Sequence, residues 1–318
     1  LDAARIYARI APASSHARHM PSHVFLPLGM WDEAAASDES AFAASADFVS
    51  RRGLSSSQLD FHSLSWLHYE YLQQGRFAKA RALMAPIEQA LAVAFAPDAH
   101  THVESEIGRG FGGVALGSER ASMRARFVVE SGEWRQMEGG TTFDNVDELF
   151  ALGLASVKLG DTPRAQAALE HMGKAIEVAP DADNRQLAAI MQLELEGALR
   201  AAAGDRRAAL GALERAATLE RQRPRPHARP YPLKPAVELY AETLLDAGDA
   251  HAAVAQFQAS LVRTPRRARS VIGLARAADA ANLGDEARRA AHEFLEMWRL
   301  ADAGRPELAE ARAILTRR

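Results

Sequence analysis

The chain has 318 residues, of which 48% are hydrophobic and 25% are charged, and its formal net charge is −3. This composition is typical of globular proteins, and the small net charge excludes a global electrostatic attraction to nucleic acid or membranes. The absence of cysteine excludes disulfides, thiolate metal sites and cysteine nucleophiles.

The first ten residues have the composition of a helix. The chain starts at Leu1 rather than Met, and no signal peptide is visible. We therefore expect the sequence to start inside a longer precursor, which leaves the compartment open between cytoplasmic and exported. No apolar run reaches the roughly 18 residues that span a bilayer, so we expect no membrane span.

Helix formers dominate the rest of the chain, and a short phrase recurs among them. An apolar helix is followed by a glycine and, five residues later, by an alanine. The copies begin at Gly29, Gly75, Gly160, Gly204 and Gly248, with degenerate copies at Gly132 and Gly284. The glycine suits a helix end in the left-handed conformation, and the alanine lets two helices approach closely.

This phrase resembles the signature of the tetratricopeptide-repeat family, whose period is about 34 residues. The resemblance covers residues 14–301 and implies an all-α fold, a right-handed α-solenoid of helical hairpins. It also implies that the first helix of each hairpin lines a concave face. Because the glycines are irregularly spaced, we expect insertions at 96–117 and 136–143. Residues 305–315 are expected to form a capping helix.

A proline-rich stretch divides the predicted array. Five prolines between residues 224 and 235 cannot lie inside a helix. We therefore expect an N-terminal array over 1–222, a linker over 223–235, and C-terminal hairpins with the capping helix over 236–318. The stretch is also basic, but it lacks interleaved aromatic residues, so it is predicted to be a solvated linker and not a nucleic-acid site.

The family register, with the glycine as position 15 of the repeat, implies which side chains line the groove. They are His16, His19 and His23 in the first hairpin, His62, Ser65 and Tyr69 in the second, and Glu119, Arg126 and Glu130 in the third. Pro21 and Pro27 each remove an intrahelical hydrogen bond, so a helix that starts only near Pro21 is the alternative.

The spacing of three histidines is the most distinctive feature of the sequence. His16, His19 and His23 are related as i, i+3 and i+7, which places them on one helical face. With His62 from the next hairpin they predict a nitrogen ligand set for zinc or copper, and three ligands with one water would be of the catalytic kind. The alternative is a polar groove in which the histidines hydrogen-bond to hydroxyl groups or to a peptide.

Three other patterns favour ordinary structural roles. His100, His102 and Glu104 are expected in a solvated loop, which would supply a ligand only if it folded over the groove. The glycines of residues 108–113 match G-x-G-x-x-G, but no strand precedes them, so nucleotide binding is not expected. His68 faces the second helix of its hairpin and is predicted to lie in the core.

A second resemblance concerns the first hairpin. The sequence His19-Met20-Pro21-Ser22-His23, followed by residues 28–34, resembles a group of bacterial tetratricopeptide-repeat proteins, and so does the segment 305–312. The resemblance implies the fold, and it implies histidine-bearing helices upstream of the first residue. It implies no particular function.

Two functional hypotheses follow. The first is a scaffold that binds a ligand, protein or peptide in the concave, histidine-rich groove, because stacked hairpins form a long curved surface. The second is a metal-dependent protein or enzyme that holds zinc or copper with the four histidines. Glu104, Asp60 and Tyr69 are then candidate acids, bases or hydrogen-bond partners of the ligands. Stoichiometric bound metal would discriminate between the two hypotheses.

Overall fold

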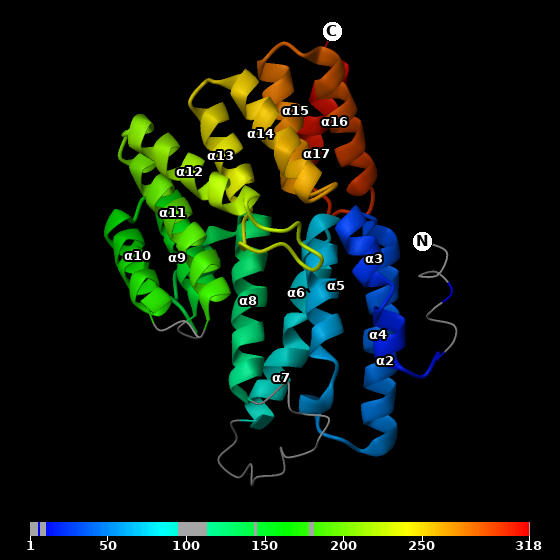
Figure 1. The fold of residues 1–318 in the computed structure, drawn as a ribbon. Coiled ribbons are helices and arrows are strands. Elements are labelled where there is room, and N and C mark those ends of the chain that lie inside the picture. The colour runs from blue at the N-terminus through cyan, green and yellow to red at the C-terminus, as the bar shows by residue number, and fades with distance from the viewer. Residues whose placement is uncertain (1–5, 7–10, 95–112, 143–144, 178–180, 318) are drawn as a thin grey trace.

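The computed structural model describes residues 6, 11–94, 113–142, 145–177 and 181–317. Within these ranges every regular element is a helix, and no residue lies in a strand (Figure 1). Successive helices pack as hairpins, each against the next, which confirms the expected all-α solenoid of helical hairpins. None of the described helices is long and apolar enough to cross a membrane.

The first three hairpins contain the candidate site. In the first, α2 (Ser15–His19), α3 (Ser22–Phe25) and the 3-10 turn η1 (Leu26–Leu28) precede α4 (Trp31–Arg52). In the second, η2 (Ser56–Gln58) and α5 (Phe61–Gln73) precede α6 (Phe77–Ala82) and α7 (Met84–Ala94). In the third, α8 (Gly113–Ser131) is followed by the short 3-10 helix η3 (Trp134–Met137).

Regular hairpins follow. They are α9 (Val146–Leu159) with α10 (Thr162–Glu177), α11 (Ala182–Ala202) with α12 (Arg206–Arg221), α13 (Ala236–Asp246) with α14 (Ala250–Arg263), and α15 (Ala268–Ala280) with α16 (Gly284–Met297). The expected capping helix is α17 (Pro306–Thr316). Because α12 packs directly on α13, the array is continuous across the proline-rich stretch.

The recurring glycines end helices as predicted, with one exception. Gly29, Gly75 and Gly160 have φ angles of 68°, 69° and 79°, in the left-handed region that glycine adopts without steric cost. At the last copy, Asn282 makes the left-handed turn with a φ of 60°, and Gly284 is already the first residue of α16. The expectation that Gly284 ends a helix is therefore wrong.

Pro21 divides the first helix into two. α2 ends at His19 and α3 begins at Ser22, because proline lacks the N–H group that would continue the hydrogen-bond ladder. Met20 and Pro21 nevertheless keep right-handed helical angles, with φ of −49° and −61°. The chain therefore keeps its direction across the break, and the histidines on either side of it remain neighbours.

The C-terminal hairpins return to the N-terminal ones. Trp31 Nε1 donates to the carbonyl oxygen of Arg266 at 2.8 Å, and Trp298 Nε1 donates to that of Gln73 at 3.0 Å. One apolar core contains residues from both ends, including Trp31, Trp298 and Phe294. The array therefore closes on itself, and in Figure 1 the blue α3 lies at the lower end of the orange α16.

The segment 223–235, called the linker below, contains no helix and crosses the inner side of the array beside α5 and α8 (Figure 1). Arg126 Nη2 on α8 donates to the carbonyl oxygen of Pro230 at 3.0 Å. Tyr231 donates from its hydroxyl to Oδ1 of Asp147 on α9 at 2.6 Å. The inner side of the solenoid therefore holds a part of the chain itself.

Candidate metal centre

Three of the four histidines expected as ligands lie together. His19, His23 and His62 each offer one ring nitrogen, and these three atoms lie within 4.8 Å of one another. The Nε2 atoms of His19 and His23 are 3.0 Å apart. The ring centroids of His19 and His62 are 4.6 Å apart, and all three rings surround the Trp66 indole.

Local structure explains how three separate segments deliver these rings. His19 is the last residue of α2, His23 is the second residue of α3, and His62 lies in the first turn of α5. Asp60 caps α5, since its Oδ1 accepts a hydrogen bond from the Ser63 N–H at 3.0 Å. Ser15 on α2 also donates to Asp60, so one carboxylate fixes the start of α5 against α2.

A buried carboxylate orients His19. Asp38 Oδ1 on α4 lies 2.6 Å from His19 Nδ1, and the two side chains are 0% and 1% exposed. An imidazole whose Nδ1–H donates to a carboxylate carries its lone pair on Nε2. This is the tautomer that points a free nitrogen at the other two histidines.

A second buried carboxyl group supports Asp38. Glu70 on α5 is fully buried, and burial together with the charge of Asp38 holds its pKa well above its usual range. A protonated Glu70 would be able to donate to Asp38, whose Oδ2, like both carboxyl oxygens of Glu70, is buried without another hydrogen-bond partner among the described residues. Glu70, Asp38 and His19 lie in a row that runs from the core to the histidine cluster. Within it, the Asp38–His19 pair resembles the carboxylate–histidine pairs that orient metal ligands in proteins.

The cluster is buried on one side and open on the other. His19 is buried, His23 is half-buried, and part of the His62 side chain is exposed to solvent. Burial among the other rings, followed by the repulsion that a protonated His19 would exert, lowers the pKa of His62 to about 4, and burial likewise lowers the pKa of His23. Both rings are neutral at physiological pH, as metal ligation requires.

His16, the fourth expected ligand, stands apart. It is exposed, and its ring centroid lies 6.5 Å from that of His19. Its ring nitrogens are not among the three that converge. The structure therefore brings only the later two histidines of the trio to His62. His100, His102 and Glu104, which are expected in a solvated loop, lie outside the described residues.

The remaining residues expected to line the groove bind the chain itself. Tyr69 accepts a hydrogen bond from Arg267 at 3.1 Å, and Glu130 lies 2.7 Å from the same guanidinium. Glu119 accepts from Arg229 Nη1 of the linker at 2.9 Å. Ser65 is buried and donates to the carbonyl oxygen of His62, and Arg126 holds the linker. His68 is fully buried, which confirms its expected place in the core.

Asp38, Glu70 and Trp66 were not identified from the sequence. A signal for Asp38 exists, because it shares the buried face of α4 with Trp31, Ala34 and Ala35. An aspartate in such an apolar stripe is expected to have a buried partner. The sequence pattern of α4 does not identify the residue that pairs with Asp38 or the helix that carries it. The pairing with His19 follows only from the packing of α2 on α4.

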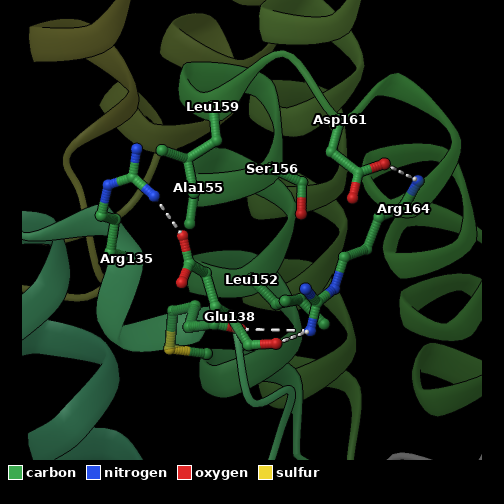
Figure 2. Close-up of a pocket in the computed structure, with 9 residues that line it drawn as sticks. Arg135, Glu138, Leu152, Ala155, Ser156, Leu159, Asp161 and Arg164 are labelled. Atoms are coloured by element: carbon green, nitrogen blue, oxygen red, sulfur yellow. Dashed lines mark hydrogen bonds and ion pairs between the residues drawn. The ribbon is translucent and has the colours of Figure 1, made fainter.

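A second concavity has a different character. A cavity of about 230 Å³ lies between η3 and the α9–α10 hairpin (Figure 2). Arg135 and Glu138, three residues apart on one side of it, pair at 2.8 Å, and Arg164 donates to the carbonyl oxygen of Glu138 at 2.8 Å. These charged groups are paired with one another and lack the convergence of the histidine cluster, so we assign no site here.

No family model matches the chain, and no curated protein sequence matches it either. Among solved structures, a tetratricopeptide-repeat protein from Parabacteroides merdae is similar at 14% identity over 95% of this chain and 97% of its own, with a TM-score of 0.45. The tetratricopeptide-repeat domain of P58(IPK) is similar at 14% identity over 97% of this chain and 81% of its own, with a TM-score of 0.30.

Proposed function

We propose that the chain binds one transition-metal ion, zinc or copper, through His19, His23 and His62. The observation that carries the proposal is the convergence of three ring nitrogens within 4.8 Å, one of them on a ring oriented by a buried carboxylate. Imidazole nitrogens suit these metals, and three of them match the ligand sets of catalytic zinc sites.

The spacing is compatible with a shared ion. Two metal–nitrogen bonds of about 2.1 Å separate their nitrogens by at most about 4.2 Å. The 3.0 Å between the Nε2 atoms of His19 and His23 falls within that limit. In the absence of an ion, His23 in its Nε2–H tautomer would donate to the Nε2 lone pair of His19 at this distance. A shared cation would take the place of that proton and bind both lone pairs.

The solvent-facing side of the histidine cluster leaves room for a fourth ligand on the proposed metal ion. Three protein ligands leave a coordination position for water or substrate, and the solvent-accessible faces of His23 and His62 border it. A metal held there would act as a Lewis acid and would lower the pKa of a bound water. The role of Asp38 and Glu70 would be to hold the His19 ring in one tautomer and one orientation.

A protein or peptide partner on the inner side of the array is the second candidate. It is favoured by the linker, since an extended proline-rich segment is already held there by Arg126 and Glu119. A similar external segment would have to displace the linker. Stoichiometric binding of a labelled peptide of residues 223–235, weakened by Arg126→Ala, would support this candidate, and no binding at excess peptide would contradict it.

Elemental analysis by mass spectrometry tests the metal proposal. Protein purified without a His tag or chelator should carry one zinc or copper ion per chain, and His16→Ala should carry the same amount. His62→Ala and the double variant His19→Ala/His23→Ala should lose the metal while circular dichroism shows the helical fold retained. A wild-type chain that holds no metal after incubation and desalting, or a double variant that keeps it, would refute the proposal.

A further inference from the structure

The distance between the two nearest ring nitrogens of the histidine cluster sets the angle at an ion that they share. The Nε2 atoms of His19 and His23 are 3.0 Å apart. Two metal–nitrogen bonds of about 2.1 Å place their nitrogens about 3.4 Å apart at the tetrahedral angle and about 3.0 Å apart at a right angle. The observed distance therefore corresponds to a right angle between the two bonds.

Both rings are supported from behind, so a cation can replace the proton between them without moving either one. His19 is 1% exposed, and its Nδ1 lies 2.6 Å from Asp38. The His23 ring packs on the indole of Trp66 with 4.4 Å between the ring centroids, and Trp66 belongs to the main apolar core. Opening the gap to its tetrahedral value would pull one of the rings away from its support.

The backbone between the two histidines is constrained as well. They are four residues apart, which places them on the same side of a helical turn. Met20 and Pro21 between them have helical φ angles of −49° and −61°, and the proline ring fixes its own φ. Ser22 is buried and donates from its hydroxyl to the carbonyl oxygen of His19 at 2.8 Å. The two nitrogens therefore form a rigid chelate.

Geometry distinguishes the metals that accept imidazole ligands. Zinc favours tetrahedral sites, whereas copper(II) favours tetragonal sites, in which neighbouring ligands stand at right angles. A square-planar copper ion has four positions in its plane. The three histidine nitrogens can take three of them, and the solvent-facing side of the cluster gives water access to the fourth.

We propose that the resident metal of this site is copper(II), held in a tetragonal arrangement with His19 and His23 in adjacent positions. His62 supplies the third position and solvent the fourth. The inference rests on the proposed function, because it requires that the three histidines bind a metal ion, and it selects copper over zinc. Zinc would still bind, with the angle between its first two ligands compressed.

Electron paramagnetic resonance of the chain loaded with one equivalent of copper(II) tests the arrangement. Affinity alone does not, because copper(II) binds more tightly than zinc to most nitrogen ligand sets. We expect an axial spectrum with the wide copper hyperfine splitting of a tetragonal site, and fewer nitrogen couplings in His62→Ala. His16→Ala is the matched control and should give the wild-type spectrum. A rhombic spectrum with narrow splitting, which tetrahedral distortion produces, would overturn the inference.

Cobalt(II) provides a second probe, because copper(II) can impose its own geometry on a flexible site. The visible absorption of cobalt(II) is intense in tetrahedral sites and weak in five- or six-coordinate ones. A rigid right-angle chelate predicts weak absorption, and intense bands would overturn the inference even beside an axial copper spectrum.

The outcomes separate the two proposals. If zinc, copper(II) and cobalt(II) all fail to bind the wild-type chain, the metal centre and this inference both fall. If one ion binds per chain through the three histidines but either probe reports a tetrahedral site, this inference alone falls.

Discussion

The carboxylate of Asp38 lies 2.6 Å from Nδ1 of His19, in a part of the core that solvent does not reach. Asp38 belongs to the second helix of the first hairpin and His19 to the segment before it, so the hairpin itself creates the pair. The contact fixes the tautomer of His19, and through it the direction of the lone pair that faces His23 and His62.

Asp38→Asn should weaken zinc binding by about 10- to 100-fold, the usual effect of removing the carboxylate behind a histidine ligand. The neutral amide still accepts the Nδ1–H bond, but it no longer raises the basicity of the ring. Competition with a chromophoric chelator would measure the change. Asp47→Asn, on the exposed face of the same helix, is the control and should leave the affinity unaltered. Equal affinities in the two variants would contradict the role given to Asp38.

Glu70→Gln should change the free energy of unfolding by less than about 1 kcal/mol, since the glutamine amide can donate to Asp38 as the protonated carboxyl does. Glu70→Ala should cost about 1–3 kcal/mol or more, because it removes the only neighbouring group proposed to donate to the buried Oδ2 of Asp38. Urea unfolding at pH 7 measures both. A large stabilisation by Glu70→Gln would show that Glu70 is ionised in the folded protein, contrary to the protonated state inferred from its burial.

Gly75→Ala should destabilise the fold more than Gly53→Ala. Both glycines have left-handed φ angles, of 69° and 61°, so each substitution costs about 1–2 kcal/mol of backbone strain. A Cβ at Gly75 would also lie 2.7 Å from Trp298 and 2.8 Å from Ala301, whereas one at Gly53 would meet nothing within 4 Å. We expect an extra cost of about 1–3 kcal/mol at Gly75 from this overpacking. Equal thermal shifts in the two variants would argue against closure of the array.

The sequence predicted the hairpins well, because their signals are local. A glycine that ends one helix, and an alanine small enough for the next helix to pack closely, can both be recognised from the adjacent sequence alone. Gly75 and Ala80 are an example. Closure of the array was not predicted. It depends on pairs such as Trp298 and Gln73, which are far apart in the sequence and carry no mutual pattern.

The candidate site was predicted in part, for a similar reason. Helical spacing and the family register pointed to His19, His23 and His62, which the structure brings together. The same spacing included His16, which lies apart from the cluster. Asp38 and Glu70 are not among the positions that the register places in the groove, so their polar role appears only once α4 and α5 are placed against α2.

His68→Leu should stabilise the protein at neutral pH and increasingly so in acid. Both ring nitrogens of His68 are buried and have no hydrogen-bond partner among the described residues, an arrangement that costs about 1–3 kcal/mol. Burial lowers the pKa of His68 to about 3, whereas in the unfolded chain it takes up a proton near 6.5.

Between these two pKa values the unfolded state binds the extra proton, so this group makes stability fall as the pH falls. The advantage of the leucine variant should therefore grow by up to about 1.4 kcal/mol for each pH unit below 6.5. Urea unfolding of both proteins at pH 7, 6 and 5 would test this. A difference that stays constant across these pH values would show that His68 has a partner or is reached by water.

Calorimetric titration of the metal-free chain with zinc tests the central claim most directly. The account predicts one site per chain, retained in His16→Ala and lost when His19 and His23 are both replaced by alanine. The absence of zinc binding in the wild-type chain, or an unchanged site in the double variant, would contradict a metal centre formed by His19, His23 and His62.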